Sequence, residues 1–380
     1  MNTSALPPRS VRRIFPEMAP SRRFLRAVSW LGVVALATGC GESENPSAPM
    51  EDGGSSGDFC VVPQQELIDG DGSGIFALTN PPMVEAEHPD ASYLSDDDRV
   101  IGLELDGEPV AVPLNILWWH EIVNLDGPET AVVVSHCPLT GSSLTFDRSV
   151  AGGAAFRVSG LLFRNNLVME GPEDSGSLWI QMQRRGACGE GAGTPMPMHP
   201  SVEISWQGWR ELHPDTRVVS EDTGFPRDYT TYPFGAYRDW NNRDVLVFQG
   251  PLDPRRPPKE PVFGVPLSDG GWVFPFGELQ QHELLAVHTA AKGDRIVVLW
   301  NREFDGAAAY IARADGRELT FEVGGEASFR DVETGSAWRM DGIAVSGPLE
   351  GHRLEPLADA YVAFWFAWAD FQPETVFVPL

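Results

Sequence analysis

The residues best suited to chemistry are soft metal ligands and nucleophiles in the first half of the chain. They are Cys137, His120, His136 and either Met169 or Met182. Thiolate, imidazole and thioether groups favour copper or zinc, and a deprotonated cysteine is the strongest ligand of the set. We therefore predict a ligand- or soft-metal-binding protein with its site in the first half, where Cys137, His120, His136 and Met169 are the candidate ligands for Cu or Zn.

Other interpretations of the same residues stay open. His136 and Cys137 are adjacent, so on a strand they would point to opposite faces. His120 could be a structural histidine bound to a backbone carbonyl, and Cys137 could be in a disulfide or buried as a small apolar residue. Cys137 could also be a nucleophile activated by either histidine and oriented by Glu121, as in a cysteine-dependent enzyme. A purely structural envelope protein is the third possibility.

A helix and a strand are expected to position these residues. Pro113 suits the first turn of a short helix over residues 114–124, which carries His120. Pro138 cannot continue a central strand, so Cys137 should lie at a strand end, where a rigid sheet can present a side chain to a cleft. Packing the helix back across the sheet would bring His120 near the thiolate. Strand-like runs separated by Gly-rich turns are found at 130–135, 143–147, 155–159 and 177–182.

The cysteine count leaves one thiol over. If Cys40 is set aside, Cys60, Cys137 and Cys188 remain, and one disulfide plus one free thiol is the simplest arrangement. The sequence does not decide the pairing. A bond between Cys60 and Cys188 would leave Cys137 as the single reactive thiol that the metal hypothesis requires.

An internal repeat organises the chain. The segment from Val100 to Pro113 resembles the segment that lies 162 residues further along, and a His-Glu pair follows each of them. A WxxWxxxxPxT pattern also occurs twice. The tryptophans of the repeated motifs are Trp179, Trp206 and Trp209 in the first copy and Trp338, Trp365 and Trp368 in the second.

This repeat predicts a mainly β (α+β) protein of two tandem homologous β-rich lobes with short helices. The expected segments are a first repeat with its lead-in at 61–220, a connector at 221–261 and a second repeat at 262–380. Tryptophans present in both copies favour a core role over an aromatic ligand pocket. His120 and Glu121 recur as His282 and Glu283, whereas Cys137 has no counterpart, so Cys137 is the better candidate for a specialised site.

The N-terminus predicts export and a lipid anchor. Arginines at 22, 23 and 26 precede a short apolar run that ends in the sequence ATGC at Cys40. We expect residues 1–39 to be a lipoprotein signal peptide, Cys40 to be lipidated and residues 40–60 to form a flexible, disordered linker. The protein would then be anchored to the cell envelope, on the periplasmic side or at the outer membrane. An ordinary signal peptide is the alternative.

The charge balance limits the partners. The chain has a formal net charge of −26, and removal of residues 1–39 would make it more acidic because that segment is rich in arginine. Such a surface repels nucleic acids and anionic lipids, so the expected partners are the membrane, through the anchor alone, and a small-molecule or metal ligand.

Several long motifs resemble those of one family. They are PLNILWWHEIVN, HCPLTGSSLTFDR, NLVMEGPEDSGSLW, DVETGSAWRMDGIAVSGPLEG and FWFAWADFQPET. The chain is identified by them as a member of the family called domain of unknown function 3179, over most of residues 65–378. The resemblance implies no established activity. It also implies a second cysteine in the turn motif, where this chain has Thr140, so chemistry that needs a CxxC pair would not be possible here.

Overall fold

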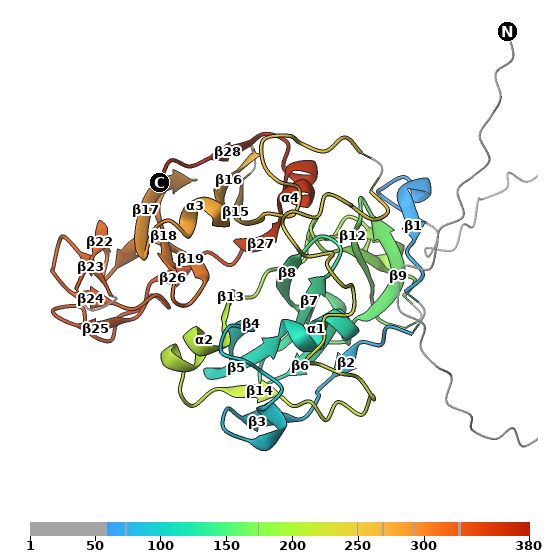
Figure 1. Ribbon diagram of the computed structural model, residues 1–380, viewed down its shortest axis with the longest axis horizontal. Coiled ribbons are helices and arrows are strands. Elements are labelled where there is room, and N and C mark those ends of the chain that lie inside the picture. The colour runs from blue at the N-terminus through green and yellow to red at the C-terminus, as the bar shows by residue number, and fades with distance from the viewer. Residues whose placement is uncertain are drawn as a thin grey trace, which may run out of the picture.

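A computed structural model describes residues 59–380 except 73, 174, 249, 268–269, 292 and 326–327. The predicted signal peptide, Cys40 and nearly all of the predicted linker lie outside the described residues. The described part is mainly β, with 41% of residues in strands and 12% in helices, which confirms the mainly β part of the predicted fold class. Its strands form seven sheets (Figure 1).

Three sheets belong to the N-terminal part of the fold. The first, in spatial order, contains β13 (Ser201–Ser205), β4 (Arg99–Leu105), β5 (Glu108–Pro113), β14 (Arg217–Val219) and β3 (Met83–Glu85). The second contains β2 (Leu78–Thr79), β6 (Ile122–Asp126), β7 (Ala131–Cys137) and β8 (Ser142–Asp147). The third contains β1 (Leu67–Asp69), β9 (Arg157–Phe163), β10 (Asn166–Glu170), β11 (Leu178–Ile180) and β12 (Arg185–Cys188).

The C-terminal part has three larger sheets and one small one. The first larger sheet contains β27 (Tyr361–Phe364), β15 (Pro261–Leu267), β16 (Gly270–Pro275) and β28 (Thr375–Phe377). The second contains β17 (Leu284–Ala291), β18 (Asp294–Asn301), β19 (Gly306–Ile311) and β26 (Glu355–Pro356). The third contains β22 (Phe321–Val323), β23 (Phe329–Asp331), β24 (Ala337–Trp338) and β25 (Ala344–Ser346). The small one pairs β20 (Arg313–Ala314) with β21 (Arg317–Glu318).

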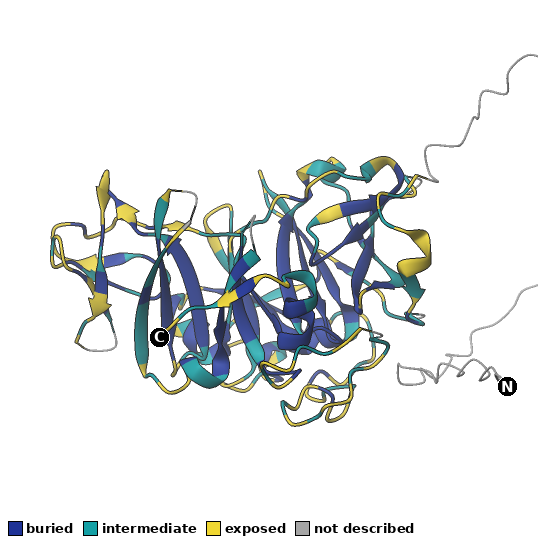
Figure 2. Cartoon of the chain, turned by 90° about the horizontal axis from the view of Figure 1, so that it is seen from above, coloured by how far each residue is buried: buried dark blue, intermediate teal, exposed yellow. Residues whose placement is uncertain are grey.

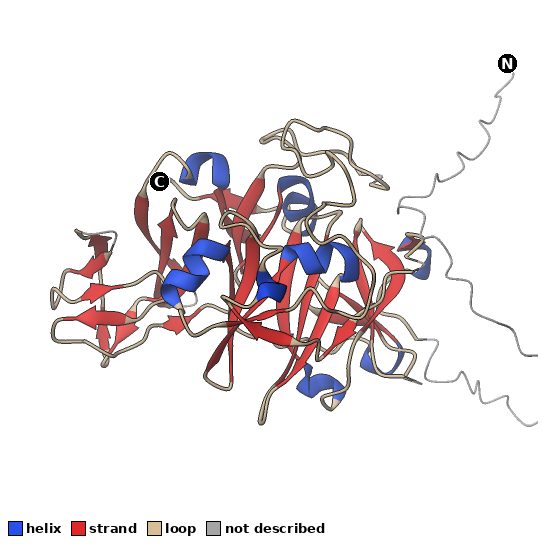
Figure 3. Ribbon diagram, turned by 60° about the horizontal axis from the view of Figure 1, so that its bottom comes forward, coloured by secondary structure: helices blue, strands red, loops and turns tan. Residues whose placement is uncertain are grey.

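The helices are short and lie along the strands (Figure 3). They are α1 (Leu114–His120), α2 (Trp206–Leu212), α3 (Phe276–Leu279) and α4 (Trp365–Phe371), with 3-10 turns η2 (Gln64–Glu66), η3 (Pro89–Ala91), η4 (Arg148–Ala151) and η5 (Gly189–Gly191). The predicted helix over 114–124 is too long. Glu121 has φ of 57°, which ends α1, and the β-branched Ile122 and Val123 then begin β6.

The element order from β4 to β14 recurs from β15 to β28. In both segments a hairpin leads into a short helix, and a later strand pairs antiparallel with the first strand of that hairpin. A last strand then pairs parallel with the second strand of the hairpin. Even the registers agree, since Ile204 lies opposite Val100 in one sheet and Ala363 lies opposite Val262 in the other.

The tryptophan motifs make the same hydrogen bonds in both segments. Trp209 Nε1 donates to Thr216 Oγ1 at 2.8 Å, and Trp368 Nε1 donates to Thr375 Oγ1 at 2.9 Å. A glycine on the neighbouring strand makes room for each ring, because a Cβ at Gly102 or at the second copy's Gly264 would overlap the tryptophan. All six tryptophans of the repeated motifs are buried.

The two segments are not packed separately. One core cluster joins α4 of the second segment to β7 and β8 of the first, and another joins α2 of the first to β18 and β19 of the second. Reciprocal backbone bonds hold the junction, since Phe364 N donates to Thr140 O and Ser205 N donates to Phe304 O, both at 2.8 Å. The buried strands therefore run through the middle of the molecule, and the more exposed sheets lie at its ends (Figure 2).

Candidate functional site at the junction of the two segments

The family motif HCPLTGS forms the hairpin between β7 and β8. Cys137 and Ser142 are its last paired residues, and a four-residue turn connects them. Gly141 in this turn has φ of 58°, and a Cβ there would lie 2.7 Å from the ring of Phe364. A glycine is therefore required for the turn to approach β27 of the other segment.

The turn is supported by a buried hydrogen-bond network. Gln181 Oε1 accepts from Ser142 Oγ at 2.7 Å and from Asn166 Nδ2 at 2.8 Å. Its Nε2 donates to Ser135 Oγ at 3.0 Å. Thr140 belongs to this network, with its Oγ1 2.8 Å from Ser142 Oγ. Satisfied buried networks of this kind fix the geometry of a site, and sequence reasoning did not identify Gln181 or Asn166 as part of it.

The structure does not bring the four predicted metal ligands together. Cys137 and Met169 lie in one core cluster, which also contains Met182. His136 precedes Cys137 and points to the opposite face of β7, toward the core cluster that contains Val132 and Val134. In the part of the chain that the structure describes, no group of three or more His, Cys, Asp or Glu side chains could hold a metal ion.

His120 is satisfied on both ring nitrogens. Its Nδ1 lies 2.7 Å from Phe76 O, so this nitrogen carries the proton, and Nε2 then accepts from Tyr229 Oη at 2.7 Å. Burial lowers the pKa of His120 to about 4, so the ring is neutral. His120 therefore has the structural role, bound to a backbone carbonyl, that was the alternative to a metal ligand. Neither ring nitrogen can bind a metal without losing a buried hydrogen bond.

Cys137 is a free thiol that is buried in the core. It is 1% exposed, and its Sγ donates weakly to Asn165 O. Burial and the nearby Glu121 carboxylate raise the pKa of Cys137 to about 11. A raised pKa disfavours the thiolate that acts as a nucleophile or metal ligand, so the predicted reactive thiol gains no support here and stays a prediction.

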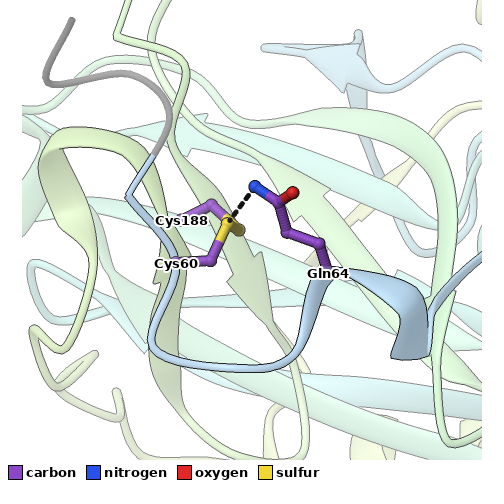
Figure 4. The surroundings of a disulfide bond; sticks show 3 residues. All are labelled: Cys60, Gln64 and Cys188. Carbon is purple, nitrogen blue, oxygen red and sulfur yellow. Dashed lines mark hydrogen bonds between the residues drawn. A yellow bond between two sulfur atoms is a disulfide. The ribbon is translucent and has the colours of Figure 1, made fainter. Parts of the chain in front are cut away.

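The other two cysteines of the described residues form a disulfide. Cys60 is bonded to Cys188, with Gln64 Nε2 3.3 Å from Cys60 Sγ (Figure 4). The bond fastens the N-terminal end of the described chain to β12. This is the pairing that leaves Cys137 free, as the metal hypothesis required.

The His-Glu pair differs sharply between the two segments. Glu121 is 6% exposed, and burial raises its pKa to about 8. In the second segment the side chain of Glu283 is 85% exposed and forms an ion pair with Arg302. Recurrence in both copies therefore does not mean a shared structural role, because the glutamate is buried only in the first segment. That argument from the sequence was wrong for Glu121.

A cavity of 580 Å³ lies beside the family motif, where both segments and the connector meet. Its first-segment wall includes Trp118, His136 and Gly141. Phe276 and Phe364 come from the second segment. The volume is in the range of small-molecule sites. Aromatic walls with a few polar groups are also typical of such sites.

Arg238 is a cationic group of this cavity that has no ion pair among the described residues. The guanidinium of Arg238 lies 4.6 Å from the ring centre of Trp118 and 4.7 Å from that of Tyr232. The two ring centres are only 5.1 Å apart, so both rings lie on the same side of the guanidinium, and its remaining N–H groups are left for a ligand.

His136 presents its second nitrogen to the same cavity. Nδ1 lies 2.9 Å from Ser143 Oγ, and Nε2 has no protein hydrogen bond within the described ranges. Burial and the charge of Arg238 lower the pKa of His136 to about 3, so the ring is neutral. A neutral ring can donate or accept one hydrogen bond at Nε2, depending on its tautomer.

Sequence reasoning missed Arg238 and Tyr232 because both lie in the predicted connector. The connector is not a passive linker: Tyr237 Oη donates to Leu139 O at 2.9 Å, and Asn115 Nδ2 donates to Tyr229 O at 2.9 Å. Its aromatic run TTYPFGAYRDW was the available signal, since flexible linkers lack large aromatic residues.

The family assignment rests on a match that covers residues 72–375. The chain belongs to the DUF3179 family. This family is described as proteins of unknown function, and the matched range includes the turn motif, the connector and the cavity. No curated protein and no solved structure matches the chain. Among the described residues of this DUF3179 protein, no helix is long and apolar enough to cross a membrane.

Proposed function

We propose that this DUF3179 protein binds a small carboxylate-bearing molecule in the cavity at the junction of the two segments. One observation carries the proposal: Arg238, packed against Trp118 and Tyr232, borders a ligand-sized cavity without a carboxylate partner among the described residues. A guanidinium has five N–H donors in a fixed fork that matches a carboxylate. His136 Nε2 supplies a second polar contact.

The charges around the cavity restrict the ligand further. Arg99 also lines it, but Glu203 and Asp305 already neutralise this arginine. Asp97, Asp98 and Asp239 add negative charge to the wall. A ligand with several negative charges would be repelled, so the proposed ligand has one carboxylate and an aromatic or apolar body, with or without an amino group.

Thermal-shift and calorimetric titrations with benzoate and phenylalanine test this function. Both probes carry one carboxylate and one ring, and only phenylalanine adds an ammonium group. Arg238→Gln should weaken binding at least tenfold, since charged hydrogen bonds of this kind contribute about 1.5–3 kcal/mol. Arg243→Gln is the matched control, because Arg243 is in the same connector but does not line the cavity. Equal affinities of the two variants, or no binding of either probe to the wild type, would contradict the proposal.

The soft-metal hypothesis and the cysteine-enzyme hypothesis gain no support from the described residues. Both need a Cys137 thiolate, and its burial opposes ionisation. A protein with a structural role in the envelope remains compatible with the fold, but no feature of the cavity favours it. Of the predicted ligand- or soft-metal-binding function, we therefore retain the binding of a small-molecule ligand.

We further propose that the two segments arose by tandem duplication and that the protein is an exported lipoprotein. The matched registers and Trp–Thr hydrogen bonds support the duplication. The arginine-rich leader and the ATGC sequence ending at Cys40 support the anchor, and the Cys60–Cys188 disulfide fits an oxidising compartment. Cys40→Ser should release the protein from the membrane fraction. Retention of that variant after a high-salt wash would contradict the anchor.

A further inference from the structure

A second cavity, of 370 Å³, lies elsewhere along the junction of the two segments. Glu203 and Val362 line both cavities, so they form a shared wall between them. The second cavity does not include the HCPLTGS turn or the connector. It is therefore a separate feature of the junction and not an extension of the site proposed above.

Small side chains keep this space open. Gly102 lines the cavity on the first-segment side, although the ring of Trp209 already fills the room beside it. On the opposite side, three consecutive alanines of β19, Ala307 to Ala309, line the cavity. Larger residues at these positions would fill the space that the two segments leave between β13 and β19.

The walls are mostly apolar and come from both segments. Leu103, Val202 and Leu212 belong to the first, and Phe263, Leu354 and Leu357 belong to the second. A charged ligand would lose its hydration against such walls without replacement, whereas an uncharged apolar ligand gains from burial.

One region of the cavity is polar and already balanced in charge. Arg353 pairs with Glu104 at 2.6 Å, and Asp341 pairs with Arg339. His213 packs against Trp209 with ring centres 4.1 Å apart, and its Nε2 lies 3.8 Å from Asp341 Oδ2. These paired charges leave no net charge for an ionic ligand to neutralise.

His199 offers a hydrogen-bond acceptor in this cavity, in addition to Glu203 Oε2 and Tyr361 Oη, which are buried there without a hydrogen-bond partner. Its Nε2 lies 2.9 Å from the carbonyl oxygen of Glu104, so this nitrogen must carry the proton. Nδ1 then holds a lone pair, and within the described ranges no protein donor reaches it. A ligand with one N–H or O–H group could donate to it.

We propose that this second cavity binds a small uncharged, largely apolar molecule with a single N–H or O–H group. The apolar walls select the body of the ligand, and His199 Nδ1 accepts its hydrogen bond. The balanced ion pairs exclude a charged ligand. This inference is independent of the carboxylate site, since it uses neither Arg238 nor His136.

The test is a fluorescence titration of the full-length protein with N-phenyl-1-naphthylamine. This probe is uncharged and has a phenyl and a naphthyl ring joined by one N–H group. We expect saturable binding to the wild type. Val202→Phe should fill the cavity and weaken binding at least tenfold, and His199→Leu should weaken it about fivefold. The matched control is Val345→Phe, because Val345 is 44% exposed and lies outside the cavity.

A second comparison separates this site from the carboxylate site and from loss of folding. Arg238→Gln should leave the affinity for the probe unchanged, and His199→Leu should unfold at the wild-type temperature to within a few degrees. Absence of probe binding to the wild type would overturn the inference. Unchanged affinity in both Val202→Phe and His199→Leu would overturn it too, as would a large loss in Arg238→Gln.

Discussion

At the scale of single residues, burial decides which groups are chemically available. Cys137 and His136 are neighbours in sequence, yet β7 turns the thiol into an apolar core and the imidazole toward a cavity. Their environments differ although their exposures are both small. The residue that carries the proposed function is therefore Arg238, whose partners are aromatic rings.

Cys137 should resist alkylation in the native state. Burial keeps its thiol protonated and out of contact with water, so iodoacetamide should modify it only after unfolding. Mass spectrometry of native and urea-unfolded samples measures this directly. Fast modification of the native protein at pH 7 would show that the thiol is accessible and would revive the nucleophile hypothesis.

Glu121 should make the protein less stable as the pH rises. Its pKa is raised by burial from the ordinary 4.5 to about 8 in the folded protein. The folded state thus binds its proton more tightly than the unfolded state does. Stability should be highest below about pH 4.5 for this group, fall as the pH rises toward 8 and then level off, with a total loss on the order of a few kcal/mol.

Urea unfolding of wild type and Glu121→Gln between pH 5 and 8 measures this contribution. The variant should lack the decline that Glu121 causes. Glu283→Gln is the matched control, because Glu283 holds the same position in the second segment but is exposed and paired with Arg302. Parallel curves for wild type and Glu121→Gln would show that the carboxyl is solvated or paired.

At the scale of elements, the repeated motifs were readable from the sequence and several boundaries were not. The strands predicted at 130–135 and 143–147 correspond to β7 and β8. The helix ended at His120 because the chain turns at Glu121, and a positive φ at a glutamate has no sequence signature. The strand positions follow from local apolar patterns, whereas the turn depends on a contact distant in sequence, since Glu121 O accepts from His136 N.

The two Trp–Thr pairs should contribute equally to stability. Thr216→Val and Thr375→Val keep the side-chain shape but leave a buried tryptophan N–H without its partner. Each change should lower the free energy of unfolding by about 1–3 kcal/mol. Thr230→Val, at an exposed position, should change it by less than about 0.5 kcal/mol. A loss in only one of the two pairs would contradict their equivalence.

At the scale of the whole molecule, the sequence predicted two lobes, and the structure shows two segments that share their cores. Residues of α2 and α4 each pack in a cluster dominated by the other segment. The domain boundaries at 61–220, 221–261 and 262–380 stay predictions, but the connector between them is part of the junction. Both cavities depend on contacts far apart in sequence, and so neither could be predicted from local patterns.

The shared junction is also why the site residues were only partly predictable. His136 and the turn were identified because their residue types are chemically distinctive. Arg238 lies about a hundred residues further along, and only the folded connector brings it to the turn. Single-sequence reasoning has no access to such a contact, although the aromatic content of the connector indicated that it packs on the body.

The most direct test of the central claim is a crystal structure of the protein with benzoate. The account predicts benzoate in the 580 Å³ cavity with its carboxylate at hydrogen-bonding distance, about 2.7–3.0 Å, from the guanidinium of Arg238, and with its ring among the aromatic residues of the wall. Benzoate bound elsewhere, or an empty cavity at saturating benzoate, would contradict it.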